Sequence, residues 1–155
     1  MSTVMNVFEQ LRNFLDETIG KCQYDENQQI IGFRARIESK LRLIDYKIVV
    51  DERGYTVCAT VPVNADENTR FSVMEYITRI NYTLRNGSFE MDLSDGEVRY
   101  KCYVLTKDLE KIPQTMIEES ITLPVLMYSR YGDGLAALIM GFSDPITEIE
   151  KAESK

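Results

Sequence analysis

The stretch 81–103 constrains the fold most, because it joins a helix end, a glycine stop and two alternating strands around an Asp-Gly pair. Asp95-Gly96 fits a two-residue hairpin turn, in which both central residues need positive φ. Such a turn predicts Leu93 opposite Val98, Met91 opposite Tyr100 and Phe89 opposite Cys102, with Asp92 facing Arg99 and Glu90 facing Lys101 on the other side. Apolar residues then share one face of the hairpin and charged residues the other.

A second hairpin is predicted from residues 43–51 and 55–61, which also alternate between apolar and polar side chains. A turn centred on Arg53-Gly54 predicts Val50 opposite Val57, Ile48 opposite Ala59 and Tyr46 opposite Val61. Pro62 ends the later strand, because proline cannot donate to a strand ladder. The alternating run 31–37 precedes this hairpin and indicates one more half-buried strand, after a polar link at 24–29.

Two amphipathic helices are predicted around these strands. Residues 3–21 repeat apolar side chains every three or four positions, with Ser2 or Thr3 as the N-cap and Gly20 at the end. Residues 66–86 carry a second apolar stripe, which begins after a capping pattern at 64–67 and stops at Asn86-Gly87.

The last third of the chain predicts further helices. Helical spacing covers about 113–131 and 134–142, and we expect Gly132-Asp133-Gly134 to interrupt the helix between them. Asp144-Pro145 can begin a short terminal helix that frays into a polar tail at about 146–155. The sequence therefore predicts a single α+β domain over 1–155. Its antiparallel five-stranded sheet carries helices on one face, in the order α-β-β-β-α-β-β-α.

Composition narrows the class of protein. The net charge of −7 and pI near 4.7 argue against nucleic-acid binding, which concentrates Lys and Arg on a surface. No run of about 18 apolar residues predicts a membrane span, and the start of the chain lacks the pattern of a signal peptide, so we expect a cytoplasmic location. Cys22, Cys58 and Cys102 are odd in number and far apart, which is typical of reduced, buried thiols.

No residue pattern predicts a reaction centre. The sequence has no histidine, which removes His-based triads and most zinc sites. The run 132–137 fits a GxGxxA pattern, but no strand precedes it, so a dinucleotide site is not expected. The run 92–97 resembles a calcium loop whose glycine is one position early, and the hairpin turn explains it. We therefore expect no enzyme activity, no cofactor and no metal.

The C-terminal helices carry more apolar and tyrosine residues than one core stripe needs. We select five as candidate interface residues: Met116, Leu123, Met127, Tyr128 and Tyr131. Methionine and tyrosine suit adaptable contacts with another protein. The alternative is that the same residues are simply buried in the core.

Several other stretches of the sequence resemble those of a known family. The run 79–81 with Gly87-Ser88-Phe89-Glu90-Met91-Asp92 and 95–100 resembles YbjN-like proteins, as do the strand 55–62 ending in proline and the closing segment 140–145. The likeness covers about residues 30–146. It implies a fold similar to the small chaperones of type III secretion, which are acidic homodimers that hold an unfolded segment of a partner. YbjN-like members are often labelled sensory-transduction regulators, and the resemblance supplies no catalytic or ligand-binding residue.

Two hypotheses for function follow. The first is a non-enzymatic, homodimeric protein-interaction module, chaperone-like or regulatory, that binds another polypeptide. The second is a small-molecule-binding domain with a pocket between sheet and helices, lined by tyrosines.

Overall fold

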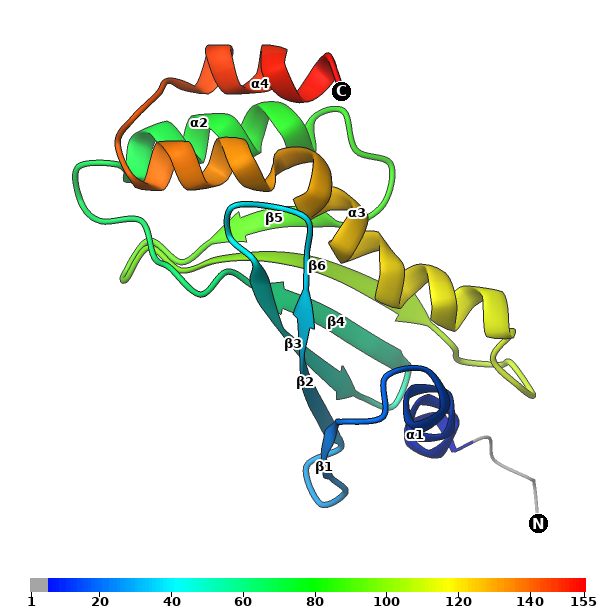
Figure 1. Cartoon of the computed structure of the whole chain (residues 1–155). Coiled ribbons are helices and arrows are strands. Elements are labelled where there is room, and N and C mark those ends of the chain that lie inside the picture. Colours follow the sequence, from blue (N-terminus) through cyan, green and yellow to red (C-terminus); the bar gives the residue numbers. More distant parts are fainter. Residues whose placement is uncertain (1–5) are drawn as a thin grey trace.

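A computed structural model describes residues 6–155, and these form one antiparallel sheet with helices on one face (Figure 1). The described elements are α1 (Val7–Thr18), β1 (Gln23–Asp25), β2 (Ile30–Arg36), β3 (Leu43–Val50), β4 (Gly54–Thr60), α2 (Arg70–Asn81), β5 (Ser88–Met91), β6 (Val98–Leu105), α3 (Gln114–Ile139) and α4 (Pro145–Glu153). The α+β class and the antiparallel pairing are thereby confirmed.

The sheet has six strands rather than the predicted five, in the order β1-β2-β3-β4-β6-β5. The additional strand is β1, which pairs with Ile30–Gly32 at the start of β2. Its sequence, Gln23-Tyr24-Asp25, is too short and too polar to show the period-2 pattern that identifies a half-buried strand. The prediction of a polar link at 24–29 was therefore wrong at its beginning.

One face of the sheet is apolar and packs against the helices. A row of paired residues crosses five strands from Phe33 through Tyr46, Ala59 and Tyr100 to Phe89. All five side chains are buried in a core that also includes the stripes of α1 and α2. Alternation along each strand places Arg34, Lys47, Arg99 and Lys101 on the opposite face.

Both predicted hairpins form, but each register differs from the prediction by two residues. In β3–β4, Val50 pairs with Tyr55 and Ile48 pairs with Val57, so the turn is centred on Glu52-Arg53. The Asp51 carboxylate starts this turn by accepting the amide N–H groups of Arg53 and Gly54. Gly54 lies in the strand rather than in the turn, and glycine is needed there because a Cβ would stand 2.0 Å from the Val104 carbonyl oxygen of β6.

In β5–β6, Met91 pairs with Val98 and Phe89 pairs with Tyr100, and the loop holds four residues rather than two. Asp92 accepts from the Ser94 amide, and Gly96 ends the loop with a φ of +80°. The shift by two residues keeps every side chain on its predicted face, because strand side chains alternate with period 2.

The first two helices are shorter than predicted. Asn6 caps α1 by accepting the Glu9 amide, whereas the predicted caps Ser2 and Thr3 lie outside the described residues. Gly20 follows its end with a φ of +81°, as expected. Helix α2 begins only at Arg70, because Asp66 binds the amides of Asn68 and Thr69 in a separate turn.

Helix α3 is continuous through Gly132-Asp133-Gly134, so the predicted interruption was wrong. The glycines serve close packing. A Cβ on Gly132 would lie 2.5 Å from the Ser39 hydroxyl, and one on Gly134 would lie 2.4 Å from the Tyr76 hydroxyl. Each glycine costs a helix about 1 kcal/mol relative to alanine, and contact with two neighbouring elements offsets that cost.

Helix α3 changes direction near its middle, where Pro124 removes a helical hydrogen bond (Figure 1). The Tyr46 hydroxyl reaches this point from β3 and donates to the Ile121 carbonyl at 2.5 Å, with the Val125 amide beside it. The carbonyl that loses its helical partner at Pro124 is that of Ser120, which accepts from the Cys102 thiol at 3.8 Å. The Tyr46 hydroxyl binds the next carbonyl along the bend.

Helix α4 begins at Pro145, capped by Asp144, as expected. It continues to Glu153 and packs on α2 and α3 over much of the segment that was predicted to fray. Within residues 6–155, no helix is both long and apolar enough to cross a membrane.

Candidate functional site

The outer edge of β6 is open to pairing at its C-terminal end. Strand β5 covers β6 only from Val98 to Lys101, whereas β4 pairs with β6 as far as Leu105. The last four residues of β6, Cys102–Leu105, therefore have a strand on one side only. We call this segment the β6 edge.

The direction of each backbone group at the β6 edge follows from the ladder. Glu97 accepts from Asp92 toward β5, and Val98 accepts from Val61 toward β4. Because neighbouring residues of an antiparallel strand point their backbone groups to opposite sides, Tyr103 and Leu105 point away from β4. Among the described residues, neither their N–H nor their C=O groups have a hydrogen-bond partner.

Contacts of Gly87 explain why β5 begins only at Ser88 and does not extend further along β6. Gly87 has a φ of +68°, and a Cβ there would lie 2.2 Å from the Tyr100 hydroxyl, which donates to the Asn86 carbonyl. The chain therefore turns away from β6 at this point. The outer side of β5 is covered, since the Asn81 side chain both accepts from and donates to the backbone of Phe89 at 2.8 Å.

A groove of about 270 Å³ runs beside the β6 edge, between it and the first half of α3. Met116 and Leu123 of α3 form its apolar wall, and Glu119 lies at its rim. Tyr103 and Leu105 are about half exposed, at 49% and 52%, on the opposite face of the sheet. The Tyr103 hydroxyl is held there by the Asp51 carboxylate at 3.0 Å. A strand laid along the β6 edge would contact both apolar sets.

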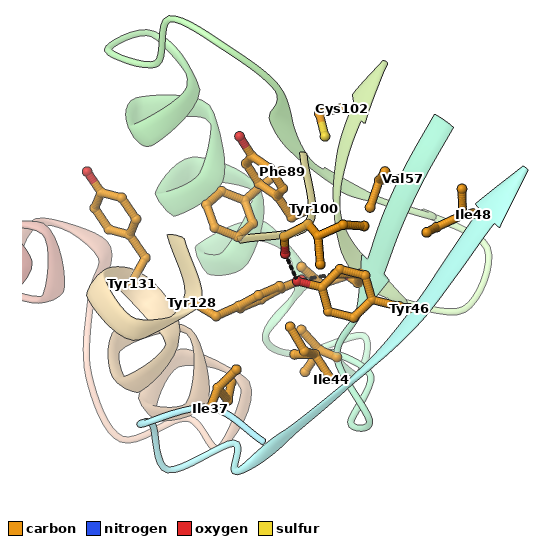
Figure 2. Close-up of a cluster of buried hydrophobic side chains, with 14 of the residues drawn as sticks. Ile37, Ile44, Tyr46, Ile48, Val57, Phe89, Tyr100, Cys102, Tyr128 and Tyr131 are labelled. Carbon is orange, nitrogen blue, oxygen red and sulfur yellow. Dashed lines mark hydrogen bonds between the residues drawn. The ribbon is translucent and has the colours of Figure 1, made fainter. Parts of the chain in front are cut away.

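The structure separates the five candidate interface residues. Met116 and Leu123 line the groove, and Met127 is half-buried against the core outside it. Tyr128 and Tyr131 are buried, and the Tyr128 ring points into the core cluster (Figure 2). The Tyr128 hydroxyl donates to the Ala59 carbonyl at 2.8 Å. These two rings therefore belong to the core, which was the alternative interpretation.

Two residues of the groove region, Tyr103 and Leu105, were missed in the sequence. Alternation places both on the polar face of the hairpin, where large apolar side chains are unusual. That contrast was the available signal. It could not reveal that β5 leaves Tyr103 and Leu105 uncovered. The point at which β5 begins to pair with β6 depends on the contact between Gly87 and Tyr100 in the folded chain.

The cysteine thiols lie in environments that favour the protonated form. Burial raises the pKa of Cys102 to about 11, and its thiol donates to the Ser120 carbonyl at 3.8 Å. Burial also raises the pKa of Cys58 and of Cys22. The three are free cysteines, and the described residues contain no cluster of three Cys, Asp or Glu side chains able to hold a metal ion.

A larger hollow of about 680 Å³ lies on α3, away from the β6 edge, between α4 and the loop at 37–42. By contrast, the space lined by Tyr76, Phe89 and Tyr131 between sheet and helices has no volume open to water. Side chains therefore fill this particular space, and the hypothesis of a small-molecule-binding domain stays a prediction.

Comparisons of the chain with protein-family models, with curated proteins and with solved structures found no match. They neither support nor contradict the resemblance to YbjN-like proteins, so the chaperone-like fold and the binding habit that it implies stay predictions.

Proposed function

We propose that this protein is a protein-interaction module that binds an extended segment of another polypeptide along the β6 edge. The observation that carries the proposal is the outward-facing backbone of Tyr103 and Leu105 beside an apolar groove. Peptides that add a strand to a sheet gain affinity from such backbone groups and specificity from pockets for alternate side chains.

The groove indicates the chemistry of the bound segment. In a strand added to β6, every second side chain would face Met116 and Leu123, and those between would face Tyr103 and Leu105. Apolar residues suit both positions. A basic residue suits the place next to Glu119, in keeping with the net charge of −7.

Peptides selected by phage display on the immobilised protein provide the test, with affinity measured on purified peptides. Tyr103→Pro removes one outward N–H and places a ring at the edge, so it should weaken binding by about tenfold or more. The matched control is Arg34→Pro, because Arg34 also points its backbone outward, at the far edge of the sheet on β2. This control should change affinity by less than about twofold.

A peptide methylated on alternate backbone nitrogens should lose binding in one methylation register and keep it in the other, because only every second amide faces β6. Equal loss of affinity with Tyr103→Pro and Arg34→Pro, or indifference to methylation, would contradict strand addition.

Dimerisation is a separate prediction that native mass spectrometry checks. A dimer that dissociates in Tyr103→Pro would assign the β6 edge to a second copy and would contradict the proposal of a different partner.

A further inference from the structure

The hollow on the C-terminal half of α3 has a floor, two walls and two unlike ends. Its floor is the helix face that carries Asp133, Ala136, Ala137 and Met140. One wall is α4 and the other is the loop at 37–42. Its volume of about 680 Å³ falls within the range of sites that hold small organic ligands.

One end of this hollow is basic. Lys40, Arg130, Asp133 and Lys155 line this end. The Asp133 carboxylate accepts the backbone N–H of Lys40 at 2.7 Å and lies 3.9 Å from the Lys155 ammonium, which also donates to the Arg130 carbonyl at 3.4 Å. Three basic residues and one acidic residue therefore line this end, in a protein whose net charge is −7. Midway along the hollow, Lys151 is balanced by Glu148 at 3.2 Å.

The other end is apolar and exposed. Phe142 is 79% exposed, and Met140 and Val63 lie beside it with roughly half of their surfaces in contact with solvent. Between the two ends, Ala136 and Ala137 keep the floor low, because their side chains are small. From Arg130 to Met140 the helix rises about 15 Å, which sets the length of the hollow.

We infer that this hollow binds a single-chain anionic amphiphile, a free long-chain carboxylate. The carboxylate lies among Lys40, Arg130 and Lys155, and the aliphatic chain runs over Ala136 and Ala137 to Met140 and Phe142. Charge complementarity fixes the orientation of the ligand. The basic end attracts the carboxylate head group, and at the apolar end the aliphatic chain removes Phe142 from water. The inference is independent of the β6 edge, which lies beside the other half of α3.

Dodecanoate, titrated below its micelle concentration into protein labelled with ¹³C at the methionine methyl groups, provides the test. The Met140 methyl signal should shift and saturate, while that of Met116, in the groove beside the β6 edge, should stay unchanged. Butyrate, with the same head and a short chain, should not saturate the site. Dodecyltrimethylammonium, with the same chain and a positive head, should bind at least about tenfold more weakly. These comparisons need no variant.

Variants separate the two ends of the hollow. Lys40→Glu with Arg130→Glu should weaken dodecanoate binding by about tenfold or more, and Lys21→Glu, an exposed change outside the hollow, should have no effect. Tyr103→Pro should also leave dodecanoate binding unchanged, so that failure here is distinct from failure of the proposed function. Equal binding of the cationic amphiphile, equal shifts of Met116 and Met140, or undiminished binding by the folded double variant would overturn the inference.

Discussion

The sheet has two open edges that share one geometry. At one, β1 covers β2 only over Ile30–Gly32, and at the other, β5 covers β6 only over Val98–Lys101. The ladder directs the backbone groups of Arg34 outward at the first edge, as it directs those of Tyr103 outward at the second. In both places a short outermost strand leaves its longer neighbour partly uncovered.

The side chains of the two edges differ. The residues that point their backbones outward on β2 are Arg34 and Arg36, both exposed, and Arg34 forms an ion pair with Asp45 at 2.7 Å. Those on β6 are Tyr103 and Leu105, beside an apolar groove. Natural proteins protect edge strands from unwanted pairing with charged side chains. The β2 edge has this protection and the β6 edge does not, which is the pattern expected if only the β6 edge receives a partner.

The comparison of the two edges depends on which backbone groups point outward. Proline substitution tests this, and its effect on the free energy of unfolding is the largest that we expect. Val104 points its N–H to β4, so Val104→Pro should lower the free energy of unfolding by about 3 kcal/mol or more. Tyr103→Pro removes a group that has no partner and should cost about 1 kcal/mol, mainly through the lost side chain. Urea denaturation of both variants measures the difference. Similar losses in the two variants would mean that the register is wrong.

Hydrogen exchange sharpens the comparison without any substitution. The amides of Tyr103 and Leu105 should exchange about a hundredfold faster than those of Cys102 and Val104, which bond to β4. The amides of Arg34 and Arg36 should likewise exchange faster than those of Phe33 and Ala35. NMR-detected exchange resolves each residue. After addition of a selected peptide, only the amides of the β6 edge should slow, and slowing at both edges would remove the distinction between them.

Replacing the charges of the β2 edge should make it resemble the β6 edge. Arg34→Leu with Arg36→Leu removes both guanidinium groups and exposes two apolar side chains along the uncovered edge of β2. We expect concentration-dependent self-association by sedimentation velocity, beyond that of the wild type, because uncharged edges pair readily. Lys47→Leu, on β3 inside the sheet, is the matched control and should not associate further. If the control associates as strongly, general hydrophobicity rather than the edge is responsible.

The sequence predicted which face the residues of β2 to β6 occupy, and it failed where glycine has a packing role. Period-2 alternation survives a shift of two residues, so the faces in both hairpins were right although both registers were wrong. Gly54 was assigned to a turn, but its position is required by the approach of the β6 backbone. Gly132 and Gly134 were likewise assigned to a helix break. In the structure they lie within α3, and Ser39 and Tyr76 occupy the space that side chains at these two positions would need.

The candidate site was only partly predictable. Met116 and Leu123 were selected because the C-terminal helices carry more apolar residues than one stripe needs, and they line the groove. The same reasoning selected Tyr128 and Tyr131, because helical spacing does not show that Pro124 bends α3 over the sheet. The difference in length between β5 and β6 creates the open edge, and it arises from contacts between segments distant in sequence.

The smallest expected effect concerns the ion pairs that hold β5 to β6 and so set where the open edge begins. Glu90 lies 2.9 Å from Arg99 and 2.8 Å from Lys101. Partial burial acts to raise the pKa of Glu90, but hydrogen bonds from Lys101 and Arg99 outweigh it and hold the pKa below 4.5. A carboxyl whose pKa is lowered by folding stabilises the folded state above the unfolded pKa, and this stabilisation is lost as pH falls through the folded value.

Glu90→Gln should therefore lower the free energy of unfolding at pH 7 by less than about 1 kcal/mol, since the three side chains are over a third exposed to solvent. The deficit should shrink as pH falls below 4.5 and as salt is added, because protonation and screening both remove the attraction. Thermal denaturation from pH 7 to pH 3 measures it, with Glu17→Gln on α1 as the surface control. A deficit that persists unchanged at pH 3 would show that Glu90 acts through packing, and the beginning of the β6 edge would then depend on Gly87 and Tyr100 rather than on charge.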